Sequence, residues 1–193
     1  KGEIGEIILR VKVLPFILAS PKTYYDINED FISSIYYRGV LHKDYPEGTI
    51  SSEYKSKEQL KAELKDMYEH GITNPICYQG SDEKFLGEYL KIRQEVGIVN
   101  QILYSIISAN CPPSAIKKII EFVKEYGIEE VYFYGIDEAS GEMLSAQRPA
   151  WEAIHGAGGK VFVAGYKGDN FALMGDIQDL FVRAGYPSRE EAE

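Results

Sequence analysis

Hydrophobic and polar positions along the chain alternate between a helical period and strand-like runs. Between residues 57 and 70 apolar side chains recur every three or four positions, which predicts an amphipathic helix. Ser56 and Gln59 have the spacing of a capping box, so we expect the helix to begin there. Gly71 has the usual role of a helix-terminating glycine, and the apolar run 72–78 predicts a strand after it.

This helix-and-strand unit recurs along the chain. Each helical pattern ends at a glycine, and the four glycines are roughly 30 residues apart, which is the size of one βα unit. Such alternation predicts a parallel sheet in sequential order with helices outside it. The expected strands are 35–38, 72–78, 101–106, 131–136 and 161–165, with a sixth candidate at 177–184, and the glycines are Gly71, Gly97, Gly127 and Gly159.

The repeat indicates an α/β fold, a parallel (β/α) TIM-barrel-like domain. A closed eight-fold barrel typically takes about 250 residues, so we expect this chain of 193 residues to form an incomplete barrel of about five to six βα units. Residues 4–18 are strand-like, and we interpret 1–30 as an N-terminal β segment, the end of a preceding β-domain, with the barrel over 31–193. Residues 40–55 show no period and are predicted to be a long surface loop.

Two adjacent carboxylates follow the most strongly apolar strand. Val131 begins a run of β-branched and aromatic residues, Gly135 then lets the backbone bend, and Asp137 and Glu138 come next. In barrels of βα units chemistry lies at this end of the strands. A carboxyl group beside a carboxylate is pushed toward its protonated form, as a general acid requires. The alternative is that Asp137 caps the following helix with Glu138 in its first turn.

The chain is rich in tyrosine, with 15 in all, and four of them share one register. Tyr78, Tyr104, Tyr134 and Tyr166 each stand seven residues after a helix-ending glycine. We expect them near the carboxyl ends of neighbouring strands, as an aromatic rim whose hydroxyls reach a solvated mouth. A layer of large core residues is the alternative.

Charge narrows the range of partners. The chain has 21 basic and 30 acidic residues and a net charge of -9. This balance argues against nucleic acids and anionic membranes, which attract a basic surface. No apolar stretch approaches the roughly 18 residues of a membrane span. Neutral ligands such as sugars are compatible with the charge but are not selected by it.

The sequence offers little support for metal or cofactor chemistry. Cys77 and Cys111 lie far apart and have no metal-ligand spacing, and Cys77, in an apolar run, is expected to be a buried free thiol. Neither a phosphate loop, a dinucleotide fingerprint nor a nucleophile elbow occurs. We therefore expect no metal and no cofactor.

The segment from Val131 to Ala139 carries a resemblance to a known family. Together with Gln147-Arg148, the run 151–155 and the run 158–163, it resembles the barrel of glycoside hydrolases of the family-123 type. It is more distantly similar to family-20 hexosaminidases. The stretch 63–78 fits the same pattern, and the likeness covers roughly residues 30–190, with the Asp-Glu pair as its specific motif.

This resemblance implies hydrolysis of 2-acetamido sugars with help from the substrate's own acetamido group. Glu138 would be the general acid/base, and Asp137 would orient the acetamido nitrogen. Tyr37, Arg38 and the four register tyrosines are the candidate substrate-binding residues.

Two alternative functions stay open. One is a carbohydrate-binding or structural, self-assembling domain without turnover, and the other is a small open α/β sheet that binds an unrelated ligand. Because an open barrel leaves sheet edges unpaired, we also expect self-association or a partner chain that covers the edge.

Overall fold

The computed structural model describes residues 10–12, 15, 31–42 and 53–186. Among these residues six parallel strands form one sheet in the order β1-β4-β5-β6-β7-β8. The strands are β1 (Tyr36–Tyr37), β4 (Ile76–Cys77), β5 (Ile102–Ser108), β6 (Glu130–Tyr134), β7 (Lys160–Gly165) and β8 (Leu180–Arg183). The predicted α/β, TIM-barrel-like and incomplete architecture is confirmed. The segment predicted over 1–30 lies almost wholly outside the described residues.

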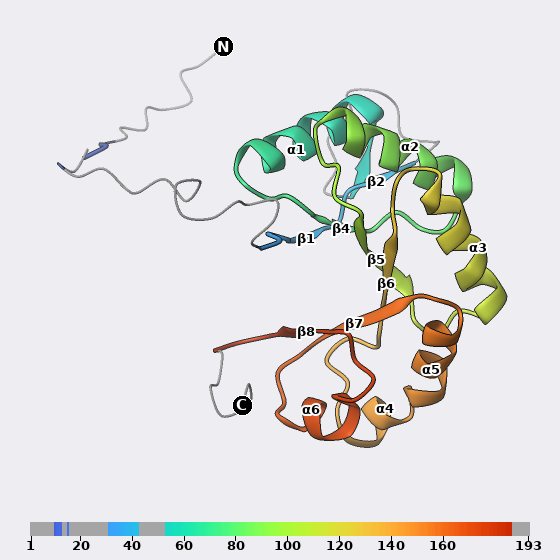
Figure 1. Cartoon of the computed structure of the whole chain (residues 1–193). Coiled ribbons are helices and arrows are strands. Elements are labelled where there is room, and N and C mark those ends of the chain that lie inside the picture. The colour runs from blue at the N-terminus through green and yellow to red at the C-terminus, as the bar shows by residue number, and fades with distance from the viewer. Residues whose placement is uncertain (1–9, 13–14, 16–30, 43–52, 187–193) are drawn as a thin grey trace, which may run out of the picture.

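Helices follow one another along one side of this sheet (Figure 1). They are α1 (Lys57–Glu69), α2 (Glu83–Glu95), α3 (Pro113–Lys124), α4 (Gly141–Ser145), α5 (Arg148–Gly156) and α6 (Asp169–Met174). None of the described helices is long and apolar enough to cross a membrane.

The sheet is strongly curled. The Tyr36 hydroxyl on β1 lies 3.3 Å from the Tyr134 hydroxyl on β6, although β4 and β5 stand between these strands in the sheet. Side chains of the first and fourth strands meet in this way only if the sheet bends into part of a barrel. The side toward which it bends, with Tyr36 and Tyr134 on it, is called the concave face below.

Alternation along each strand divides the apolar residues between two layers. On the convex side, Leu103, Phe133 and Val163 pack under the helices as part of the main core. A smaller cluster on the concave face contains Ile76, Tyr134 and Phe162. Burial of apolar surface against the helices stabilises the first layer, and aromatic edge contacts such as Tyr134 on Phe162, at 4.8 Å between ring centroids, contribute to the second.

Local signals at the helix ends act as the sequence predicts. The Ser56 hydroxyl accepts a hydrogen bond from the Gln59 amide at 3.2 Å, and Gln59 Oε1 accepts one from the Ser56 amide at 3.0 Å. This capping box satisfies two otherwise unpaired donors at the start of α1. After α5, however, the left-handed residue is Gly158, at φ 89°, and not Gly159.

Two segments differ from the prediction. The single helix expected before Gly158 is divided into α4 and α5, because Pro149 stands in the first turn of α5, where a missing N–H costs no hydrogen bond. The predicted surface loop 40–55 contains two short strands, β2 (Val40–Leu41) and β3 (Tyr54–Lys55), which pair in parallel. Strands of two residues are too short to produce a visible alternation in the sequence.

Candidate functional site

A cavity of about 540 Å³ opens at the carboxyl ends of the parallel strands. Its lining comes from β1, the loop after β4, β5, β6 with its following loop, and β7. The lining residues are Tyr36, Arg38, Tyr78, Ile106, Tyr134, Asp137, Glu138 and Ala164. Asp137 and Glu138 are adjacent in sequence, and both line this one cavity because they lie on the loop beyond β6.

Three hydrogen bonds donated by backbone amides fix the course of that loop. The Gly135 amide donates to the Phe162 carbonyl at 2.9 Å, and the Glu138 amide donates to the Ala164 carbonyl at 3.0 Å. Between them, the Ile136 amide donates to Oε1 of the buried Gln147 at 2.7 Å. The loop is therefore attached both to β7 and to the residue that precedes α5.

Glu138 has an unusual backbone conformation, with φ at 53°. Residues other than glycine rarely adopt this left-handed backbone conformation, which costs roughly 1–2 kcal/mol relative to the right-handed one. Strain of this kind collects at functional sites, where the surrounding structure holds it in place. The capping alternative is wrong, because the residue that precedes α4 as its N-cap is Ser140 and not Asp137.

The two acids have different surroundings. Asp137 Oδ1 accepts a hydrogen bond from the Tyr134 hydroxyl at 2.6 Å. Burial, and next the hydrogen bond to Asp137, raise the pKa of Tyr134, so its phenol stays protonated and remains a donor. The described part of the chain offers no such donor to the Glu138 side chain. One carboxylate is thus held by a phenol, and the other is left to solvent and ligand.

Arg38 contributes a positive charge to the same cavity. It has no ion-pair partner within residues 31–42 and 53–186 and is exposed. A guanidinium group presents several N–H donors in a plane and suits hydroxyl or carboxylate groups of a ligand. Arg38, a candidate substrate-binding residue of the sequence analysis, thus lines the same cavity as the two acids.

Tyr37, the neighbouring candidate, points to the other side of the sheet. Its hydroxyl donates to Glu63 Oε2 at 2.7 Å, and its ring packs on the main core under α1. Tyr36 takes its place in the cavity and was missed by the sequence prediction. Alternation could have found it, because Tyr36 and Arg38 are two positions apart and must share a face.

Tyr104 and Tyr166 do not line the cavity either. Tyr104 lies opposite Tyr132 on the concave face, 5.1 Å away between ring centroids, because β5 begins late after Gly97. The β5 residue at the level of Tyr134 is Ser108. Tyr166 follows β7 directly, but it is 49% exposed and is not among the residues that line the cavity.

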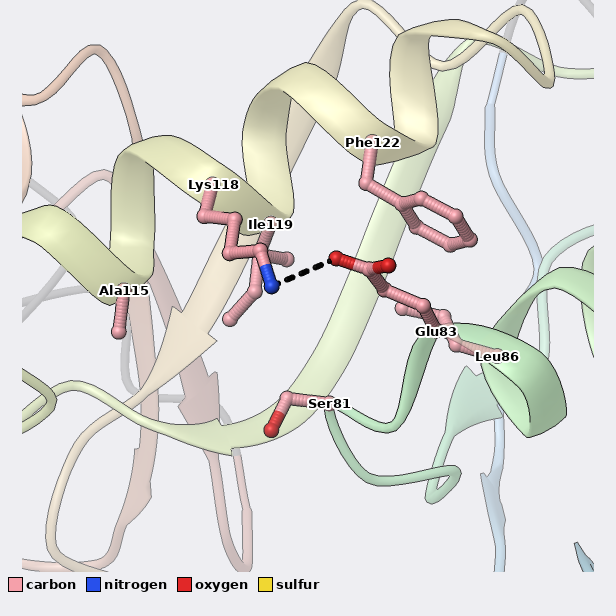
Figure 2. Close-up of a pocket in the computed structure, with 7 residues that line it drawn as sticks. All are labelled: Ser81, Glu83, Leu86, Ala115, Lys118, Ile119 and Phe122. Carbon is pink, nitrogen blue, oxygen red and sulfur yellow. Dashed lines mark ion pairs between the residues drawn. The ribbon is translucent and has the colours of Figure 1, made fainter.

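A second cavity lies between α2 and α3 and has a volume of about 160 Å³. Figure 2 shows Lys118 and Glu83 facing each other across it, and Lys118 Nζ lies 2.9 Å from Glu83 Oε1. Ser81 and Phe122 are among the other side chains around it. The two charges neutralise each other, and the cavity lies among the outer helices, away from Asp137 and Glu138.

The described residues contain no group of three or more metal-ligating side chains of the His, Cys, Asp or Glu type. Cys77 is buried, as expected, and its burial raises the pKa of its thiol to about 12. It therefore does not supply a thiolate at neutral pH. The chemistry available at the cavity comes from two carboxylates, three phenols and one guanidinium group.

No protein-family model matches the chain, and no curated protein matches it either. Among solved structures, a catalytic-lysine mutant of the sialic acid aldolase of Ruminococcus gnavus is similar, with a TM-score of 0.46 and 14% sequence identity. The similarity covers 81% of this chain and 53% of that one, so the chain spans about half the length of that protein. The function proposed below rests on the residues of the cavity.

Proposed function

We propose that this cavity belongs to a glycoside hydrolase-like domain that acts on 2-acetamido sugars by a substrate-assisted, retaining mechanism. The observation that carries the proposal is that Asp137 and Glu138 both line one cavity at the carboxyl ends of the strands, together with Tyr36, Tyr78 and Tyr134. The tyrosine rings offer flat faces to a sugar, and Arg38 offers donors to its hydroxyl groups.

In this mechanism the acetamido oxygen attacks the anomeric carbon of the same sugar while the bond between that carbon and the leaving oxygen breaks. Glu138 gives its proton to that oxygen as general acid. Asp137, ionised and held by Tyr134, accepts a hydrogen bond from the acetamido N–H and stabilises the positive charge of the cyclic intermediate. Glu138 then takes a proton from water, which attacks the same carbon and restores the acetamido group with retention of configuration.

The test compares aryl 2-acetamido-2-deoxyglycosides with matched aryl glycosides that carry a 2-hydroxyl group. Glu138→Gln should lower turnover of the acetamido substrate about 10²–10⁴-fold, the usual loss for a general acid. Asp137→Asn should lower it as well, and more on the acetamido sugar than on the hydroxyl sugar. Initial rates and melting temperatures are measured on the same preparations, so that lost activity is separated from lost folding.

Glu142→Gln is the matched control, because Glu142 is an exposed glutamate of the same segment, on α4 and outside the cavity. It should leave turnover unchanged. Full activity in a folded Glu138→Gln variant would refute the hydrolase proposal. Saturable binding of the sugar without turnover in the parent protein would instead favour a non-catalytic carbohydrate-binding domain.

A further inference from the structure

Two tyrosine hydroxyls and one carboxylate, those of Tyr36, Tyr134 and Asp137, form a continuous line of hydrogen bonds across the concave face, which we call the relay. Tyr134 Oη lies 2.6 Å from Asp137 Oδ1 and 3.3 Å from Tyr36 Oη. Tyr36 is on β1, and Tyr134 is on β6, so the relay joins strands that are not neighbours in the sheet. It exists only because the sheet curls.

The direction of the hydrogen bonds follows from proton counting. A phenol has a single O–H, and the Tyr134 proton is taken by the carboxylate at 2.6 Å, since an ionised carboxylate can only accept. In the 3.3 Å contact Tyr134 must therefore accept, and Tyr36 must donate. The order is Tyr36 to Tyr134 to Asp137, and both donors point toward the carboxylate.

Packing holds the central ring of the relay in place. Tyr134 is 9% exposed and makes edge contacts with Phe162 at 4.8 Å and with Tyr36 at 6.1 Å between ring centroids. Asp137, in contrast, is an exposed loop residue. An exposed carboxylate is thus hydrogen-bonded to a buried donor whose ring is held by its neighbours.

We infer that Tyr134, supported by Tyr36, is a positioning residue that fixes the carboxylate of Asp137 so that Oδ2 faces the acetamido group of the substrate. This inference rests on the proposed function. It also separates the roles of the two acids: Asp137, whose Oδ1 accepts the hydrogen bond from Tyr134, is the orienting group. Glu138, whose side chain accepts no such hydrogen bond among the described residues, keeps the role of general acid in the proposed mechanism.

The first test needs no turnover. With specifically labelled tyrosine, proton NMR should show the Tyr134 hydroxyl as a downfield signal protected from exchange with water. Asp137→Ala should remove the protection or shift the signal strongly. The absence of such a signal, or a signal that Asp137→Ala leaves in place, overturns the relay whatever the activity of the protein.

The second test measures selectivity between the acetamido and the hydroxyl sugar. Tyr134→Phe keeps the ring and removes the hydroxyl, and should lower turnover of the acetamido substrate about 10- to 100-fold, the range that corresponds to a hydrogen bond to a charged group. Turnover of the hydroxyl sugar should fall much less. Tyr36→Phe should act in the same direction but more weakly, because its hydroxyl reaches the carboxylate only through Tyr134.

Tyr132→Phe is the matched control, since Tyr132 lies on the same strand and face as Tyr134 but outside the relay. It should leave the selectivity unchanged. Equal losses on both sugars in Tyr134→Phe would indicate a structural role only and would overturn the inference. If the parent protein hydrolyses neither sugar, the proposed function fails, and the hydroxyl signal alone decides whether the relay exists.

Discussion

At the residue scale, the site depends on small differences between adjacent positions. Tyr36 faces the cavity and Tyr37 faces the helices, because successive strand residues point to opposite sides. Asp137 and Glu138 escape this rule, since they lie on a loop where the backbone turns through the left-handed conformation of Glu138. That conformation is what brings two neighbouring carboxylates into one cavity.

The strain at Glu138 leads to a prediction about stability. Glu138→Gly should raise the free energy of unfolding by about 0.5–1 kcal/mol, because relief of the left-handed strain exceeds the entropy that glycine loses on folding. Turnover should nevertheless disappear with the carboxylate. Urea unfolding of the variant and the parent measures the first effect.

Glu142→Gly provides the opposite expectation, because Glu142 lies in the short helix α4 and is not among the described residues with a left-handed backbone. Glycine should lower stability there by about 1 kcal/mol. If Glu138→Gly were as destabilising as this control, the backbone at Glu138 would not be strained, and the argument from strain would fail.

At the scale of elements, the end of β6 and the start of its loop are set by close packing. A side chain at Gly135 would place its Cβ 3.0 Å from Trp151 Cζ2 and 3.2 Å from Val163 Cβ. The missing side chain thus allows β6 to approach α5 and β7 closely. Gln147 then holds the Ile136 amide and directs the chain toward the acids.

Gly135→Ala should therefore destabilise the protein by about 1–3 kcal/mol, the usual cost of overpacking a core. The measurement is equilibrium unfolding in urea. Gly156→Ala is the control, because Gly156 ends α5 and a methyl group added there would meet no side chain within 4 Å. That change should be neutral or stabilising by up to about 1 kcal/mol, so equal losses in both variants would contradict the packing argument.

At the scale of the whole molecule, the described sheet has outer strands at β1 and β8 and a concave face with partly buried apolar residues. Leu180 and Val182 on β8 belong to that face and are only half-buried. Unpaired strand edges beside apolar surface favour association with another chain. We therefore keep the expectation that self-association or a partner chain covers this edge.

Light scattering after size-exclusion chromatography tests self-association of the chain. We expect the apparent mass to rise with concentration, and Val182→Lys to lower the association without changing the helical content seen by circular dichroism. Val99→Lys is the control, because Val99 is 74% exposed on the loop before β5, away from the concave face. A monomer of constant mass at all concentrations, in the absence of any partner, would contradict self-association.

The sequence by itself determined the elements that depend on local pattern. The order and parallel direction of the strands, the capping box of α1 and the position of the Asp-Glu pair beyond β6 all follow from periodicity, from capping residues and from glycine. The capping box and the position of the acids depend on neighbours a few positions away, and the strand order follows from the regular alternation of helix and strand, so both can be predicted from the sequence alone.

Only the tertiary structure decided which side chains meet at the site. The curl of the sheet brings Tyr36 to Tyr134. The late start of β5 places Tyr104 below the cavity, whereas the spacing from the glycines predicts it at the mouth. Neither effect has a local signal, because both depend on how strands far apart in the chain are staggered and bent against one another. The physical reason is that the stagger of the strands and the curvature of the sheet are set by the packing of the whole sheet on its helices, whereas the pattern of each segment specifies only its own helix or strand.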